Sequence, residues 1–252
     1  RSCTGAWRAE PVSANCLMTE TVAFPKALAA WAVAWIVGGG FLGALVLAAL
    51  GGVSGEPLTP IRLAAVALVS WLTLLVAVVA VARSEGIGWL RSVGLGAVPR
   101  FRVGDLWAIV AGAVTQTLLI PAVYFPLRAV WSDTFSPDRL SDTARDLVDA
   151  ADGAGIVLLV LVVAAGAPIV EEIVYRGLLQ RSLAARVGGP SAILIVSALF
   201  ALIHLRWVEL PGLFVAGLLF GLCLHRTGRL GTAILAHAAF NLTGLIAVFA
   251  TG

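Results

Sequence analysis

GIVLLVLVVAAGAPIVEEIVYRGLLQR, residues 155–181, is a long apolar stretch that contains two adjacent glutamates. Across the chain, 60% of the residues are hydrophobic and 12% are charged, whereas about a quarter of the residues in soluble domains are charged. A helix needs about 20 apolar residues to cross the hydrocarbon core of a bilayer. The composition and this stretch therefore predict an all-α protein, a polytopic transmembrane helical bundle.

Apolar segments of suitable length predict about seven spans. They cover residues 27–50, 62–82, 106–127, 154–175, 190–205, 211–225 and 230–250. The last three are shorter and contain glycines, so the count is good to one span. We expect a single membrane domain over residues 26–252.

The first 25 residues lack the continuous apolar core of a cleavable signal. The only methionine of the chain is Met18, so we expect translation to start there and residues 1–25 to form a disordered extension. Cys3 and Cys16 then carry no information. Cys223 lies alone in an apolar helix, so neither a disulfide nor a cysteine metal site is predicted.

Charges in the loops predict the orientation, because Lys and Arg concentrate on the cytoplasmic side. Arginines cluster in residues 83–105, 176–186 and 226–229, whereas residues 128–153 carry six aspartates and three arginines. We therefore expect the N-terminus inside and residues 128–153 outside. The basic residues are spread over several short loops, which gives no support for a nucleic-acid partner.

The two glutamates differ in their neighbours along the helix. Glu172 precedes Arg176 by four residues, the favourable order for a helical ion pair, so we predict a structural pair. Glu171 points about 100° away around the helix and has Tyr175 one turn later. A charged group inside the bilayer is costly unless it is paired or hydrated, which makes the unpaired Glu171 a candidate general base.

Two of the three histidines, His204 and His237, also lie within apolar segments. If the spans that carry Glu171 and His204 form an antiparallel hairpin turning at residues 188–190, these two residues lie at the same depth. His237 and Glu171 are about 13 to 15 Å from their predicted cytoplasmic helix ends. Asn241 lies one turn after His237, so one cavity can contain all four side chains.

Three short motifs occur in order on separate predicted spans. EEIVYR at 171–176 fits E-E-x-x-x-R, FALIH at 200–204 fits F-x-x-x-H, and HAAFN at 237–241 fits H-x-x-x-N. Together they resemble the CPBP intramembrane endopeptidases, the family of type II CAAX prenyl endopeptidases and of bacteriocin-processing and immunity (Abi) proteins. The resemblance covers about residues 154–250, which would form the catalytic core.

The resemblance implies hydrolysis of a peptide bond within the membrane. We expect no cofactor, with zinc as the alternative. Glu171 and His204 would activate the attacking water, and His237 with Asn241 would stabilise the oxyanion of the tetrahedral intermediate. The substrate would be a membrane protein or a lipidated peptide, and no residue pattern selects a prenyl group. We expect an integral protein of a bacterial plasma membrane whose site is reached from the cytoplasmic side.

Two other functions stay open. Glu171, His204 and His237 are a ligand set typical of catalytic zinc, so the same protease could be zinc-dependent. Alternatively, the protein could be a proton-coupled carrier or a scaffold that confers immunity by binding. The sequence shows no inverted repeat of the kind common in carriers, which favours the protease hypothesis.

Overall fold

The computed structural model describes residues 21–53, 56–95 and 102–251. Within these ranges every regular element is helical, and six helices are long and apolar enough to cross a membrane. These six are Phe24–Ala49, Pro60–Ser84, Val103–Val130, Ala154–Val187, Leu210–Thr227 and Leu230–Thr251. The prediction of an all-α polytopic bundle is therefore confirmed.

Several spans consist of α-helical pieces joined by π-helical turns, and one begins with a 3₁₀ turn. The first span joins α2 (Phe24–Ala34), η1 (Trp35–Leu42) and α3 (Gly43–Ala49), and the second is α4 (Pro60–Ser84). The third joins η2 (Val103–Leu106), α6 (Trp107–Val114), η3 (Thr115–Leu119) and α7 (Ile120–Val130). The fourth joins α9 (Ala154–Val160), η4 (Leu161–Gly166), α10 (Ala167–Glu172), η5 (Ile173–Gln180) and α11 (Arg181–Val187).

The remaining helices are α5 (Trp89–Ser92), α8 (Pro137–Asp149), α12 (Gly189–Ile203), α13 (Leu210–Thr227) and α14 (Leu230–Thr251). The predicted fifth span at 190–205 corresponds to α12, whose 15 residues extend about 22 Å. This is shorter than the hydrocarbon core, so α12 falls outside the six long spans. The expected count of seven is reached only if α12 is included.

The predicted N-terminal extension partly coincides with ordered structure. Residues 1–20, including the expected start at Met18, lie outside the described residues. Val22 is nevertheless buried in the core, and α2 begins at Phe24 with Pro25 in its first turn. Helix α2 thus begins two residues before residue 26, with Pro25 in a position that suits the first turn of a helix.

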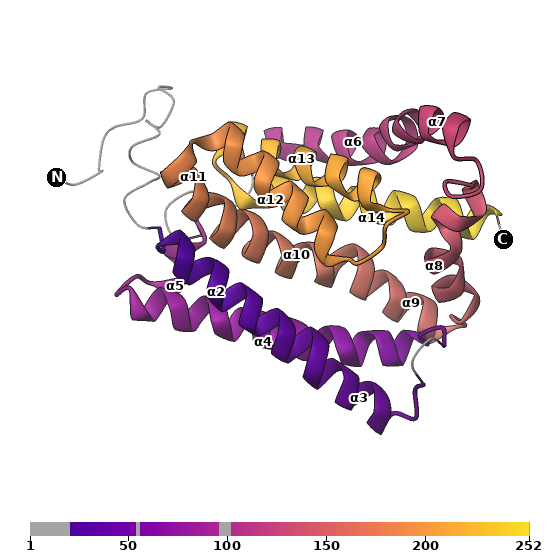
Figure 1. Ribbon diagram of the computed structural model, residues 1–252, viewed down its shortest axis with the longest axis horizontal. Helices are drawn as coiled ribbons and strands as arrows, with labels where there is room; N and C mark the ends of the chain where they lie inside the picture. Colours follow the sequence, from indigo (N-terminus) through magenta and orange to yellow (C-terminus); the bar gives the residue numbers. More distant parts are fainter. Residues whose placement is uncertain (1–20, 54–55, 96–101, 252) are drawn as a thin grey trace.

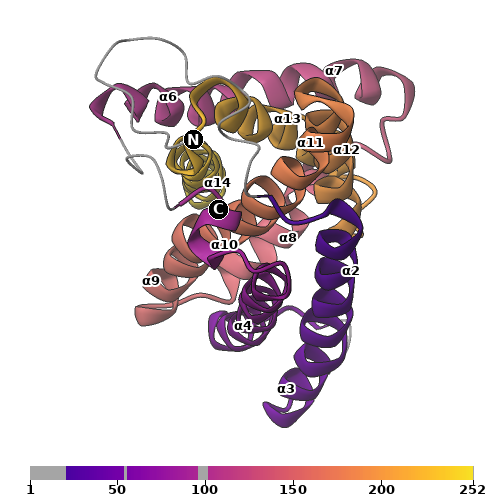
Figure 2. The same cartoon turned by 90° about the vertical axis from the view of Figure 1, so that its left-hand side faces the viewer.

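The fourth span is the centre of the bundle (Figures 1 and 2). Its η5 segment contacts α2, α4, α12, α13 and α14, and all eight of its residues are buried. On one side of the fourth span lie α2, α3 and α4, and on the other lie α12, α13, α14 and α6. The two glutamates are therefore carried by the helix with the most neighbours.

The bundle has two distinct ends. Gly188, between α11 and α12, and Gly228, between α13 and α14, have φ values of 81° and 66° and end their helices at one extremity, which we call the Gly188 end. Glycine adopts positive φ without strain. The opposite extremity, the α8 end, carries α8, residues 204–209 and the start of α4 (Figure 1).

Candidate active site

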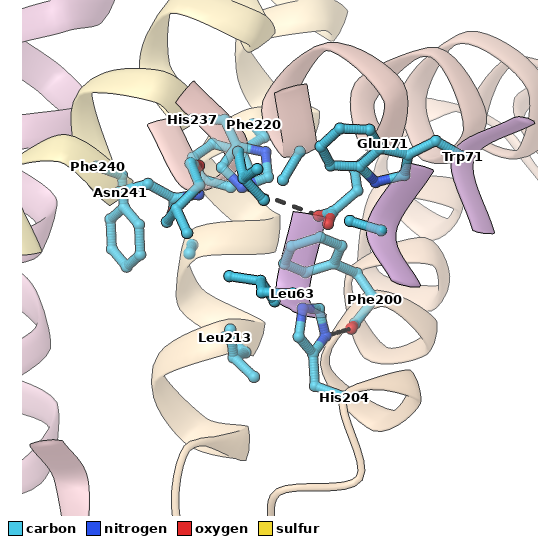
Figure 3. Close-up of a pocket in the computed structure, with 15 residues that line it drawn as sticks. Leu63, Trp71, Glu171, Phe200, His204, Leu213, Phe220, His237, Phe240 and Asn241 are labelled. Atoms are coloured by element: carbon cyan, nitrogen blue, oxygen red, sulfur yellow. Dashed lines mark hydrogen bonds and ion pairs between the residues drawn. The ribbon is translucent and has the colours of Figure 1, made fainter. Parts of the chain in front are cut away.

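A cavity of about 280 Å³ lies between α4, the fourth span, α12, α13 and α14. Glu171, His204, His237 and Asn241 all line it, and the other lining residues are aliphatic or aromatic (Figure 3). The structure thus brings together the four residues that the sequence analysis selected. An apolar wall around a few convergent polar groups is the usual form of a ligand site.

Glu171 lies in the last turn of α10 and faces this cavity. Its side chain is 23% exposed, whereas that of Glu172 is fully buried. His237 lies beside Glu171 in the cavity, with its Nε2 3.9 Å from Glu171 Oε2. This separation is longer than a hydrogen bond, so Glu171 can accept a proton from a molecule in the cavity.

Glu172 is not among the residues that line the cavity, and it has two partners. Its Oε1 accepts hydrogen bonds from Arg176 Nη1 at 2.9 Å and from His237 Nδ1 at 2.8 Å. The first contact is the ion pair suggested by the spacing of four residues. The second is a contact that the sequence analysis did not anticipate, because it joins the fourth span to α14.

The contact with Glu172 sets the orientation of the His237 ring. Because the carboxylate accepts at Nδ1, that nitrogen carries a proton and Nε2 faces the cavity. Phe220 stacks on the ring with centroids 4.3 Å apart and planes 15° from parallel. His237 is therefore held by a hydrogen bond at one edge and by a ring on one face.

Arg176 is fully buried and has contacts beyond Glu172. Its Nη2 donates to the Gly217 carbonyl oxygen at 3.0 Å, and its guanidinium carbon lies 4.7 Å from the Phe200 ring centroid. Cation–π contacts of this kind stabilise a desolvated guanidinium. The residue thus links the fourth span to α12 and α13, close behind the cavity.

His204 caps the C-terminal end of α12, on another wall of the cavity (Figure 3). Its Nδ1 donates to the Phe200 carbonyl oxygen at 2.6 Å, since a carbonyl oxygen only accepts. In its neutral form, a ring that donates from Nδ1 has Nε2 as a hydrogen-bond acceptor. No hydrogen bond or ion pair joins His204 directly to Glu171.

Asn241 is also fixed by a backbone contact. Its Nδ2 donates to the Val163 carbonyl oxygen at 2.8 Å, in the π-helical segment η4. This contact uses one of the two amide hydrogens and leaves the second. The amide therefore joins α14 to the fourth span while lining the cavity.

Residues 153–243 match the family model of the type II CAAX prenyl endopeptidase Rce1-like proteins. This Rce1-like segment starts one residue before the predicted core and contains all three motifs. The family resemblance is therefore confirmed. Searches among curated proteins and among solved structures gave no match.

Part of the cavity wall comes from outside the Rce1-like segment. Leu63, Ala67 and Trp71 of α4 line the cavity opposite α13 and α14. The sequence analysis missed them because the motifs lie in the later spans and α4 shows only continuous hydrophobicity. Their spacing of four residues, on one helical face, was the available signal.

The zinc alternative receives no support from the arrangement of its ligands. Zinc donors lie about 2.0 to 2.3 Å from the metal, so three ligands must approach one point. Among the described residues no group of three histidine, cysteine, aspartate or glutamate side chains is close enough to hold a metal ion. Glu171, His204 and His237 of the Rce1-like segment share the cavity without forming such a group.

Part of the cavity wall lies close to the α8 end of the bundle. His204 follows the last residue of α12, and Leu63 and Leu213 lie three residues after the starts of α4 and α13. All three are at the α8 end, which the loop charges place outside. Depths counted only from the Gly188 end did not reveal this. The predicted orientation and the predicted cytoplasmic access both stay predictions.

Proposed function

We propose that this protein is an intramembrane endopeptidase that hydrolyses a peptide bond of a membrane-associated protein or lipidated peptide. The observation that carries the proposal is the convergence of Glu171, His204, His237 and Asn241 on one apolar cavity. The match of residues 153–243 to the Rce1-like endopeptidase family supports the same class of reaction. Neither observation selects a prenyl group, so the lipid on the substrate stays undefined.

In this proposal a water molecule between the Glu171 carboxylate and the free Nε2 of His204 is the nucleophile. Glu171 takes one proton as the water oxygen attacks the scissile carbonyl carbon. His204 orients the water through its second hydrogen. When the C–N bond breaks, the proton held by Glu171 passes to the leaving amine nitrogen.

The oxyanion of the tetrahedral intermediate would accept hydrogen bonds from His237 and Asn241. Because Nδ1 of His237 donates to Glu172, only the imidazolium form has a hydrogen on Nε2 to donate into the cavity. Glu172 holds the His237 ring with its Nε2 toward the cavity, where an oxyanion would form. The second amide hydrogen of Asn241 supplies the other donor.

We further propose that the substrate reaches the site from the α8 end, because the cavity extends from the middle of the bundle to that end. If the loop charges set the orientation, this end faces the outside of a bacterial plasma membrane. The side of the membrane is open to direct test.

The function is tested by comparing cells that produce the wild type with cells that produce Glu171→Gln. New N-termini in the membrane proteome, identified by mass spectrometry, should appear with the wild type and be absent with the variant. Glu171→Gln keeps the side-chain size, and the carboxylate is not needed for an ion pair inside the core. Identical sets of termini, at equal protein levels, would exclude the protease and favour a scaffold.

A further inference from the structure

A second cavity, of about 380 Å³, lies at the α8 end between α7, α8, α13 and α14. None of the four proposed active-site residues lines it. It shares only Leu213 and Phe240 with the catalytic cavity, so these two side chains form the partition between them. In Figure 1, α7 and α8 lie together at this end, beside the C-terminal part of α14.

Some of the polar and charged groups of this second cavity have partners and one does not. Glu209 Oε1 lies 2.6 Å from Arg206 Nε, so its charge is balanced. The Tyr124 hydroxyl donates to the Val208 carbonyl oxygen and accepts from the Gly212 amide. Arg128, by contrast, has no ion-pair partner among the described residues, and its buried Nε has no hydrogen-bond partner. Arg128 is therefore the cation of this cavity wall that is left without an ion-pair partner among these residues.

The position of Arg128 near the end of the third span indicates which kind of anion can bind it. Arg128 lies two residues before the end of α7 at Val130, and Trp131 follows. Helix α8 next to it has no buried residue, and its Leu140 and Ala144 face the cavity. A cation at a span end, beside a tryptophan and an amphipathic helix, lies at the level of lipid headgroups.

The rest of the wall suits an acyl chain. From Arg128 the lining continues along the third span to Gln116, twelve residues away, or about 18 Å along a helix axis. The side chains between and opposite are mainly aliphatic or aromatic, among them Ile120, Ala247 and Val248. Gln116 contributes the only amide, at the deep end.

We propose that this cavity binds one lipid with an anionic phosphate headgroup. The phosphate pairs with the Arg128 guanidinium, and an acyl chain lies along α7 and α14 toward Gln116. Charge-assisted bonds between arginine and phosphate are among the stronger polar contacts, and basic pockets between spans are known to hold anionic headgroups. The bound chain packs against Leu213 and Phe240 on the side opposite the catalytic cavity.

The experiment measures lipid binding to the purified full chain in detergent by native mass spectrometry. Phosphatidylglycerol and phosphatidylcholine with identical acyl chains are the two probes, and glycerol phosphate is the headgroup without chains. We expect phosphatidylglycerol to bind about tenfold more tightly than phosphatidylcholine. Equal affinity for the two lipids, or equal binding of glycerol phosphate, would overturn the proposal.

Two variants localise the binding. Arg128→Gln should reduce the preference to less than about twofold, whereas Arg145→Gln, which removes an exposed arginine of α8 that pairs with Asp138, should retain it. Ala144→Phe fills the cavity without changing charge and should weaken both lipids. An unchanged preference in folded Arg128→Gln would show that the anionic lipid binds elsewhere. None of these residues belongs to the proposed active site, so binding is scored independently of proteolysis.

Discussion

At the scale of single residues, the two adjacent glutamates perform different tasks because their side chains leave the helix in different directions. Glu171 reaches a cavity, whereas Glu172 is buried between Arg176 and His237. Helical spacing is enough to separate the two and to pair Glu172 with Arg176. The contact with His237 depends on how α14 packs against the fourth span, and no local pattern specifies that packing.

Removing the Glu172 charge should affect both stability and activity. Glu172→Gln leaves Arg176 buried without its counter-ion, which typically costs about 3 to 5 kcal/mol, and it also loosens His237. The double variant Glu172→Gln with Arg176→Gln should recover part of the stability, because no uncompensated charge is left. Activity should stay low in both variants, since neither orients the His237 ring with a carboxylate.

Thermal unfolding in detergent and peptide cleavage measure these two effects separately. The matched control is Glu171→Gln, which should unfold near the wild-type temperature while losing activity. If Glu171→Gln and Glu172→Gln lose equal activity with equal unfolding temperatures, the division of roles between the two glutamates is wrong.

The roles of Glu171, His204 and His237 also decide whether the proposed reaction needs a metal ion. With Glu171 and His204 as the water-activating pair, we expect cleavage to persist after exhaustive chelation and dialysis of the purified enzyme. The measurement is cleavage of a substrate found in the proteome comparison, with metal content determined in parallel. Activity that disappears on chelation and returns with one equivalent of zinc would instead support Glu171, His204 and His237 as ligands.

At the scale of elements, α13 packs closely against α12 and the fourth span, next to the candidate active site. A Cβ added at Gly217 would lie 3.0 Å from the Ser197 Cβ and 3.1 Å from its Cα. The Gly217 carbonyl oxygen also accepts a hydrogen bond from Arg176. Small residues at such contacts let two helices pack closely, as expected from the G-x-x-x-G spacing of Gly217 and Gly221.

Gly217→Ala should therefore lower the unfolding temperature, with a cost of about 1 to 3 kcal/mol for overpacking. Gly40→Ala is the control, because a Cβ at Gly40 meets no atom within 4 Å. Alanine is the better helix former, so this control should be neutral or slightly stabilising. Thermal melts of the two variants in the same detergent make the comparison. A Gly217→Ala melt that matches Gly40→Ala would show that α13 can move without cost.

Sequence periodicity and length predicted most of the elements but not their interruptions. Continuous apolar segments specify spans because a bilayer requires them, which is why the predicted ranges lie within or close to the observed helices. The π-helical turns near Val163 and after Glu172 have no comparable pattern. The wall supplied by α4 was missed for a related reason, since a lipid-facing helix and a cavity-lining helix are equally hydrophobic.

At the scale of the whole molecule, the distribution of arginines and the position of the cavity together bear on the side of the membrane from which a substrate would reach the cavity. Arginines such as Arg181, Arg186, Arg226 and Arg229 lie toward the Gly188 end. Leu63, His204 and Leu213 of the cavity wall lie toward the opposite end. A membrane protein whose basic loops stay in the cytoplasm would then present its active site to the exterior.

Reporter fusions test this orientation directly. A fusion after residue 140, within α8, should be exported and active as a periplasmic phosphatase, and a fusion after residue 187 should stay inside. Cysteine labelling of the full chain provides an independent check. Trp207→Cys should react with a membrane-impermeant thiol reagent applied from outside, and Arg186→Cys should not. If instead the residue-140 fusion stays inside, the charge-based orientation is wrong, and the cavity then faces a cytoplasmic substrate. Both outcomes leave the geometry of the four residues unchanged, but they assign the substrate to opposite sides of the membrane.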